Sequence, residues 1–341
     1  MKKFNNLKVV ENFKYFVIVP VAILLTAIIL LFTIGANIGI DFAGGAIVKF
    51  DVGGYITVDG QAKEDVKKII VDEVESKGFK VSQERWSGDD NNVLELGLSL
   101  ELDGNKIDVN DVEEQEEFRT RIEGSVENPN SGLQSAIENA VLAYNAQIEE
   151  VTMEFNFVGA SASKLLKNAI WATVVAVIVM LIYIIIRFTL SSGLSAVICL
   201  LHDVLIMIAL TTIFRIQINT TFIAAVITIV GYSINATIVL FDRVREVKKL
   251  ASMKDKTNEE IANKAVGDTL SRSILTTITT LAAIVVLSII CAILGITAMQ
   301  EFALPIVFGL IAGTYSSILL APSSWVLLNK LGKKIKKGKK A

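Results

Sequence analysis

The sequence has little of the chemistry that disulfides, metal centres and most active sites require. Its 341 residues include only one histidine, His202, and two cysteines, Cys199 and Cys291, both inside apolar segments. The polar part of the chain must therefore fold without disulfides. We find no zinc, haem or iron–sulfur signature, no phosphate loop, no nucleotide fingerprint and no nucleophile elbow. We expect no metal, no other cofactor, no enzymatic activity and no nucleic-acid partner.

What the chain has instead is apolar sequence and an uneven distribution of charge. Hydrophobic residues make up 52% and the mean hydropathy is +0.55, which is typical of a membrane protein. The net charge of −2 conceals a partition. Residues 37–167 carry 12 basic and 26 acidic residues, a net charge of −14, and the rest carries 21 basic and 9 acidic residues, a net charge of +12. We therefore expect one acidic, water-soluble block and an apolar remainder with basic edges.

Six segments are long enough to cross a bilayer, which takes about 20 apolar residues. The predicted spans are Phe16–Ile34, Ala169–Ile186, Leu194–Phe214, Phe222–Phe241, Ile274–Leu294 and Phe302–Leu328.

The positions of lysine and arginine predict the orientation. The N-terminus, the 242–272 loop with eight basic residues and the tail from Lys330 to Lys340 with seven lysines all fall on one side. Both termini are therefore expected to be cytoplasmic. The first span is predicted to be retained, because its apolar run exceeds a signal peptide's and no small-x-small site closes it. The predicted domains are a cytoplasmic amphipathic N-terminus (1–15), helix 1 (16–36), an extracytoplasmic domain (37–167), helices 2–6 (168–328) and a basic tail (329–341).

Two short stretches leave alternatives open. Residues 4–16 form either an amphipathic helix on the inner membrane surface or a frayed basic tail. The acidity of the external domain either attracts basic ligands or, as we favour, provides a solvated face.

The external domain has the pattern of an α+β fold. Strands are predicted at Ala46–Asp51, Phe79–Glu84, Val93–Ser99 and Glu149–Phe157, and helices at Ala62–Ser76 and Gly132–Tyr144. This order is that of a split βαβ, ferredoxin-like unit. Residues 101–130 are acidic and poor in apolar groups, which predicts an insertion or mobile loop.

His202 and Asp203 interrupt the third span near its centre. A carboxylate there costs on the order of 3 kcal/mol. The pair is either a structural contact to a neighbouring helix or a proton-titratable site. We favour the second hypothesis, because an uncharged polar side chain could make a structural contact at a lower free-energy cost than a carboxylate.

The segment Gly231–Glu246 (GYSINATIVLFDRVRE) carries polar side chains within an apolar helix. Asn235 must face protein or a wet cavity, because hydrocarbon offers an amide no partner. Ser233 and Thr237 are candidates for the same polar path or interface.

Hydroxyls and glycines recur at helical spacing in the last two spans. Thr276, Thr277 and Thr280 follow Ser273 along the fifth span, and they either line a hydrated path or pack against other helices. Gly309 and Gly313 in the sixth span predict close helix packing.

The charges at the cytoplasmic ends of the spans suggest a fixed network. Asp242 and Glu246 lie near several arginines, and we expect ion pairs that hold the 242–272 loop. The residues of this surface are Arg187, Asp242, Arg243, Arg245, Glu246 and Arg272.

Six motifs in order carry a family resemblance. They are the GIDFAGG segment with Gly39, Asp41, Gly44 and Gly45, then YIIIRF ending near Arg187, His202-Asp203-Val204, GYSINATIVLFDRVRE, Ser271-Arg272-Ser273, and FAL followed by GTYSS from Gly313. The chain resembles the SecF branch of the SecD/SecF protein-export family, within the resistance–nodulation–division superfamily. The resemblance implies a bacterial cytoplasmic-membrane protein that assists export with the proton gradient. Its implied partners are SecD, SecYEG, YajC, secreted chains and membrane lipids.

The sequence departs from that family at one position. SecF proteins commonly have Asn-Asp-Thr in the fourth span, and the acid is implicated in proton transfer, whereas this chain has Asn235-Ala236-Thr237. Either SecD supplies the acid, or Asp203 compensates, or coupling is weak. Asn235 is expected at the SecD interface. The alternative functions are a related exporter of lipids or small molecules and an assembly subunit with no transport role.

Overall fold

The computed structural model describes residues 8–39, 45–52, 60–87, 93–108, 111–124, 132–144, 151–158, 160–187, 189–294 and 297–338. The chain forms two compact units. The first contains 1–37, 170–289 and 301–341, and the second contains 38–169 and 290–300. Five residues of the GIDFAGG motif, 40–44, lie outside the described residues, and Asp41 and Gly44 are among them.

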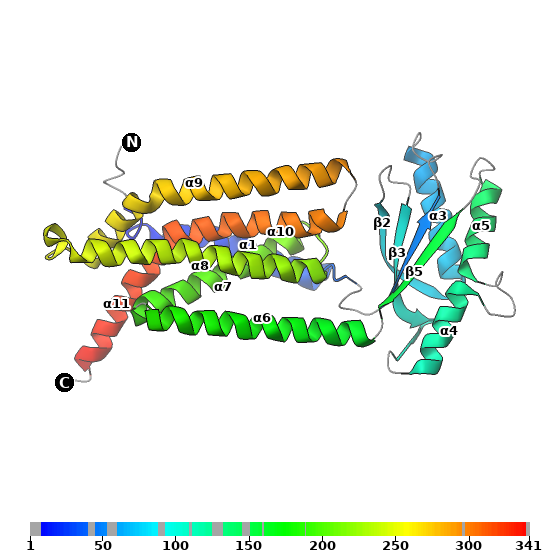
Figure 1. The fold of residues 1–341 in the computed structure, drawn as a ribbon, viewed down its shortest axis with the longest axis horizontal. Helices are drawn as coiled ribbons and strands as arrows, with labels where there is room; N and C mark the ends of the chain where they lie inside the picture. Colours follow the sequence, from blue (N-terminus) through cyan, green and yellow to red (C-terminus); the bar gives the residue numbers. More distant parts are fainter. Residues whose placement is uncertain are drawn as a thin grey trace. The chain divides into compact units, whose positions relative to one another are not determined.

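Long helices make up the first unit (Figure 1). They are α1 (Phe13–Thr33), α6 (Ala160–Arg187), α7 (Leu190–Ile213), α8 (Thr220–Lys249), α9 (Asn258–Ile293), α10 (Thr297–Tyr315) and α11 (Ala321–Gly338), with a 3-10 turn at Ala251–Met253 and a π-helical turn, η4, at Ser316–Leu320.

Five segments of the described residues are long and apolar enough to cross a membrane. They correspond to α1, α7, α8, α9 and the stretch Met299–Gly332. The remaining predicted span, 169–186, falls within α6, of which only Ile170–Val179 counts as a shorter apolar helix. A membrane protein with several helical spans is therefore confirmed, and the count of six stays a prediction.

The helix starts follow from local capping. The Thr189 hydroxyl accepts a hydrogen bond from the Ser192 amide at the start of α7, and Asn219 Oδ1 accepts one from the Phe222 amide at the start of α8. Thr257 and Glu260 form a capping box before α9, since the Glu260 carboxylate accepts from the Thr257 amide at 2.9 Å.

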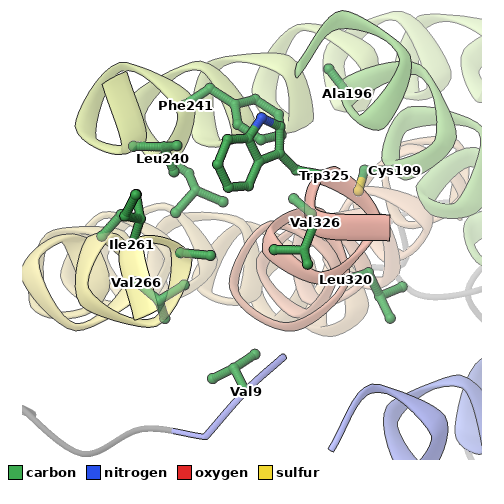
Figure 2. Packing of buried hydrophobic residues seen from close by; sticks show 14 of the residues in the cluster. Val9, Ala196, Cys199, Leu240, Phe241, Ile261, Val266, Leu320, Trp325 and Val326 are labelled. Carbon is green, nitrogen blue, oxygen red and sulfur yellow. The ribbon is translucent and has the colours of Figure 1, made fainter. Parts of the chain in front are cut away.

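A buried apolar cluster joins α7, α8, α9 and α11 at one end of the helical unit (Figure 2). Trp325 lies near its centre, and Val9 joins it from the N-terminal segment. Asn263 holds that segment: its Oδ1 accepts from the Val9 amide at 3.1 Å and the Val10 amide at 3.2 Å, and its Nδ2 donates to Glu11. Residues 9–12 form turns and α1 begins at Phe13, so the described part of 4–16 lacks the surface helix considered above.

The second unit contains an antiparallel sheet. Its strands are β1 (Gly45–Asp51), β2 (Phe79–Ser87), β3 (Val93–Leu102), β4 (Asn105–Lys106) and β5 (Thr152–Val158), in the order β2-β3-β1-β5 with β4 paired to β3. Helices α3 (Gly60–Ser76) and α5 (Leu133–Tyr144) pack on it. Alternate residues of β1, among them Val48 and Phe50, are fully buried, as expected for a sheet covered on one face. The predicted strands and helices are confirmed in their order.

Residues 112–123, part of the stretch predicted to be an insertion or mobile loop, form a helix, so the loop alternative is wrong there. This stretch is helix α4 (Val112–Glu123), and the Asp111 side chain caps it by accepting from the amides of Glu113 and Glu114. Phe118 and Ile122, one helical turn apart, are fully buried in the core of the unit. Two apolar residues among acids are too few for the periodicity to stand out in the sequence.

Candidate functional site

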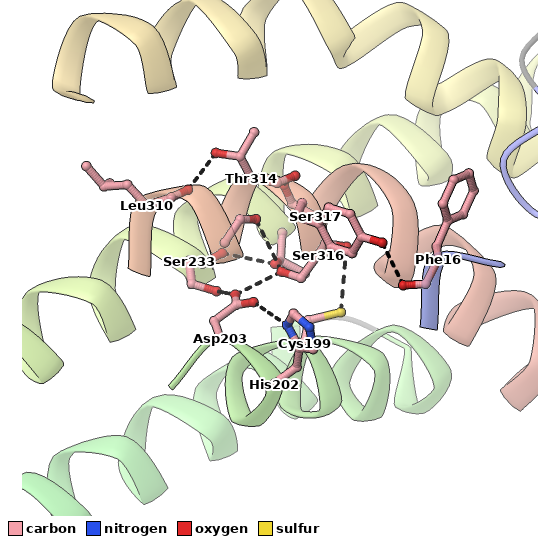
Figure 3. Close-up of polar contacts among 12 residues, drawn as sticks. Phe16, Cys199, His202, Asp203, Ser233, Leu310, Thr314, Ser316 and Ser317 are labelled. Carbon is pink, nitrogen blue, oxygen red and sulfur yellow. Dashed lines mark hydrogen bonds and ion pairs between the residues drawn. The ribbon is translucent and has the colours of Figure 1, made fainter. Parts of the chain in front are cut away.

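Asp203 lies at the meeting point of α7, α8 and the π-helical turn. Its side chain is fully buried. The hydroxyls of Ser233 on α8 and Ser316 in the π turn both donate to Asp203 Oδ2, the second at 2.8 Å. The other carboxylate oxygen, Oδ1, lies 2.8 Å from His202 Nδ1 (Figure 3). The two central polar residues of the predicted site are thus together, and Ser233 from the candidate polar path joins them.

His202 connects this carboxylate to the first helix. Its ring stacks on Tyr315 with centroids 6.4 Å apart, and the Tyr315 hydroxyl donates to the Phe16 carbonyl at 2.6 Å. The second ring nitrogen, Nε2, is buried and has no hydrogen-bond partner among the described residues. A buried polar atom without a partner is unusual and marks a place where a proton or a ligand can be accepted.

The chain passes close to the site at Gly313 and then changes its helical register. A β-carbon at Gly313 would lie 3.5 Å from Asp203 Oδ2 and 3.6 Å from the Ser233 side chain, which is ordinary van der Waals contact. Three residues later the π turn begins at Ser316. Such turns insert one residue and re-aim the side chains beside it, and they are frequent at functional sites. Here the re-aimed group is the Ser316 hydroxyl.

Asp203 is held by three hydrogen-bond partners. Both serine hydroxyls donate to its Oδ2, and His202 Nδ1 lies 2.8 Å from its Oδ1. When Nδ1 of a histidine carries the hydrogen, Nε2 is left with a lone pair that can accept one.

The other candidate hydroxyls fall into two groups. Thr277 bridges three helices, with the Tyr232 hydroxyl at 2.9 Å and the Thr314 hydroxyl at 2.8 Å. Thr237 and Thr280 instead donate to carbonyls one turn back in their own helices. These two are accounted for by local bonding within the helix, as serine and threonine in membrane helices often are.

Asn235 lies at a different place from Asp203. It lines a pocket of about 70 Å³ with Ala236, Arg272 and Thr276. Ser233 and Asn235 are two residues apart, about 200° around a helix, so they face different sides of α8. The structure therefore separates the predicted residues into a buried site at Asp203 and a pocket at Asn235.

The predicted ion-pair network is built on Arg243. Its guanidinium donates to Asp268 at 2.8 Å and to Glu246 at 2.7 Å, which ties the end of α8 to α9. Within the described residues Asp242, Arg245 and Arg272 make no ion pair. The side chain of Arg187 is not among those described.

Several contributing residues were not singled out from the sequence. Ser316 and Tyr315 belong to the GTYSS motif but had no assigned role. Asp268 and Asn263 lie in α9, within the stretch that was predicted to be the 242–272 loop. A serine pair just after two glycines in a span was the only signal.

Comparison with known proteins decides the family. Residues 137–331 match the family described as protein export membrane protein SecD/SecF, C-terminal. The chain is 31% identical over 332 residues to protein translocase subunit SecF of Helicobacter pylori (strain J99), covering 96% of this chain and 90% of that protein. It is 32% identical over 337 residues to SecF of Sebaldella termitidis, with 98% and 96% covered. The chain belongs to the SecD/SecF family.

A solved structure with this fold is SecDF from Thermus thermophilus, a translocon-associated membrane protein. The TM-score is 0.69 at 24% identity, and the match covers 97% of this chain. The chain spans 40% of the length of that SecDF chain. The SecD/SecF match over 137–331 includes every residue of the Asp203 site except Phe16.

Proposed function

We propose that the chain is a SecF-type subunit of the Sec translocase accessory complex, which assists protein export at the bacterial cytoplasmic membrane together with SecD. Family membership and the similarity to SecF proteins over nearly their whole length support this proposal. The similarity to proteins named SecF and to a solved SecDF structure supports association with a SecD-type partner. SecYEG, YajC and secreted chains are the further partners that the proposal includes.

The proposed topology has six spans, with both termini and the 242–272 loop in the cytoplasm and residues 37–167 outside. The distribution of lysine and arginine supports this orientation. The external domain contacts the emerging chain in this proposal, and no enzymatic step is involved.

The proposed proton site is the pair of Asp203 and His202. The observation that supports it is the fully buried carboxylate with three hydrogen-bond partners beside a buried ring nitrogen that has none within the described part of the chain. Adding or removing a proton at His202 Nε2 changes the charge of a site that α7, α8 and the π turn share. A change of charge there alters the hydrogen bonds that hold these elements together, which couples protonation to helix packing.

Export in cells that depend on this subunit tests the proton role. Asp203→Asn keeps the shape of the side chain but removes the negative charge that stabilises a proton on His202, so the part of export that responds to the proton gradient is expected to be lost. Asp255→Asn is the matched control, because Asp255 is exposed and makes no ion pair among the described residues. Normal gradient-dependent export in Asp203→Asn cells, at an unchanged protein level, would remove Asp203 from proton coupling.

One observation favours a second function, an assembly subunit without a transport role. Ala236 contributes only a methyl group to the Asn235 pocket, at the position where the family resemblance leads us to expect an acid. For an assembly subunit, deletion of the gene reduces export, yet Asp203→Asn and collapse of the proton gradient change nothing further. Proton flux in vesicles that contain the purified subunit with its SecD partner separates the two functions.

A further inference from the structure

A larger pocket lies away from the Asp203 site, where the start of α7, the end of α8 and α11 meet. Its volume is about 370 Å³. It shares no lining residue with the Asn235 pocket, and Asp203 and His202 do not line it. It needs an explanation of its own.

The wall of this pocket is positively charged. Arg245 and Lys248 line it from one face of α8, and none of the described residues that line it is acidic. Both side chains are exposed, and neither makes an ion pair in the described part of the chain. Two other basic residues of α8 and α11 do make ion pairs: Arg243 pairs with Asp268, and Lys330 pairs with Glu259 at 2.5 Å. The pocket therefore holds two positive charges without a counter-charge from the described residues.

The base of the pocket is apolar. Phe241 and Val244, on the same face of α8 as the two cations, are 2% and 3% exposed, and Trp325 of α11 is 3% exposed. Tryptophan is enriched where a membrane meets water, because its ring is apolar and its N–H is polar. A ligand that fits must combine a negative group with an apolar part.

An exposed apolar stripe leads away from this pocket along α7. Leu190 follows Thr189, a lining residue, and the stripe continues through Leu194, Ile198 and Leu201 at helical spacing. These side chains are all exposed. A chain of methylene groups anchored in the pocket has a hydrophobic surface to lie against.

We propose that this pocket, the α8 phosphate pocket, binds the phosphate group of an anionic phospholipid. Arg245 and Lys248 contact the phosphate, because a guanidinium donates two parallel hydrogen bonds to phosphate oxygens and an ammonium adds a point charge. Trp325 and Phe241 cover the glycerol, and the acyl chains follow the stripe on α7. Free phosphate satisfies the two cations but leaves the apolar base without a partner. The inference rests on the placement of α7 and α8 in a membrane, and not on transport.

Fluorescence of Trp325 tests the proposal in the full-length protein. The sequence has three tryptophans, so Trp86→Phe with Trp171→Phe leaves Trp325 as the only reporter. This protein is placed in phosphatidylcholine vesicles that contain increasing fractions of a bromine-labelled phosphatidylglycerol or a bromine-labelled phosphatidylcholine, since bromine quenches tryptophan on contact. Half-maximal quenching is expected at a fraction of labelled phosphatidylglycerol about 25-fold lower than the fraction of labelled phosphatidylcholine that is needed. Each of the two basic residues is expected to contribute about 1 kcal/mol, or about fivefold, to this preference.

Substitutions test whether the preference for phosphatidylglycerol comes from the pocket. Arg245→Gln and Lys248→Gln, made separately, are each expected to reduce the preference about fivefold. Lys249→Gln is the matched control, because Lys249 is an exposed neighbouring lysine that does not line the pocket. It is expected to leave the preference unchanged.

Three outcomes would overturn the proposal. Equal quenching by the two lipids shows that no anionic lipid is selected. An equal loss of preference in Lys249→Gln and Lys248→Gln shows a diffuse surface charge and no pocket. Relief of quenching by inorganic phosphate, to the same extent as by added unlabelled phosphatidylglycerol, assigns the pocket to free phosphate. The measurement uses no export and both leaflets carry the labelled lipid, so its failure leaves the proposed function and topology standing.

Discussion

The Ser316 hydroxyl donates a 2.8 Å hydrogen bond to Asp203 Oδ2, although the two residues are 113 positions apart in the chain. Ser316 is also the first residue of the π turn between α10 and α11. A carboxylate on one span therefore depends on an irregular turn in another. The Cys199 thiol, one turn from Asp203 on α7, lies 4.0 Å from the Ser316 carbonyl, so side chains of α7 contact both the main chain and the side chain of Ser316.

Removal of the Ser316 hydroxyl is expected to weaken both stability and coupling. Ser316→Ala deletes one donor and leaves a buried carboxylate oxygen with one partner fewer, at a cost of about 1–3 kcal/mol. The midpoint of thermal unfolding in mild detergent should fall, and gradient-dependent export should decrease. Ser323→Ala is the control, because Ser323 is also buried but donates only to the Leu319 carbonyl of its own segment. Equal effects of the two substitutions would contradict a special role for Ser316.

The elements of this protein were largely predictable from its sequence because their signals are local. The apolar runs that became α1, α7, α8 and α9 exceed the length of a bilayer crossing, and the alternation in β1 and β3 matches a sheet covered on one face. Helix α4 was missed because it lacks such a local apolar signal. Its two core residues, Phe118 and Ile122, are outnumbered by charges that favour solvent.

The site was predictable only in part, because its geometry depends on distant contacts. Asp203 stood out as an acid in an apolar span, but nothing in its neighbourhood of sequence identified Ser316 as its partner. Likewise Ser233 and Asn235, two positions apart in one motif, lie on different sides of α8: Ser233 contacts Asp203, and Asn235 lines a pocket. The π turn that brings Ser316 to Asp203 has no sequence pattern that distinguishes it from a regular helix.

Close packing of α10 against α8 predicts that alanine substitutions at two glycines have different effects on stability. A β-carbon at Gly309 would lie 2.4 Å from Ile229 Cγ1, so Gly309→Ala forces a shift that costs about 1–3 kcal/mol. At Gly231, on α8, nothing lies within 4 Å of the added carbon, and Gly231→Ala should be neutral or stabilising because alanine favours helix. Thermal unfolding in detergent compares the two. Combining Gly309→Ala with Ile229→Ala should restore part of the loss, and failure to do so would show that Ile229 is not the obstacle.

The hydrogen bonds that hold the N-terminal segment at residues 9–11 depend on one side chain, Asn263. Asn263→Ala removes the acceptor of two amides, those of Val9 and Val10, and the donor to Glu11, so residues 9–11 should exchange hydrogen faster by about 10-fold or more. Hydrogen–deuterium exchange followed by mass spectrometry of the full-length protein measures this. Asn258→Ala serves as the control, because Asn258 lies at the start of the same helix and its side chain makes no hydrogen bond within the described residues. Unchanged exchange at 9–11 in Asn263→Ala would mean that burial of Val9 alone holds the segment.

Helix α4 gives the sharpest test of the second unit, because the sequence predicted an insertion or mobile loop there. Phe118 is fully buried and packs edge-on against Phe79 with ring centroids 5.1 Å apart. Phe118→Ala should therefore destabilise the domain by about 3–5 kcal/mol, the usual cost of emptying an aromatic site in a core. Val112, in the first turn of the same helix, is 70% exposed, and Val112→Ala should change little. Limited proteolysis of the full-length protein compares the two, and equal cleavage rates in both variants would show that α4 does not contribute to the core.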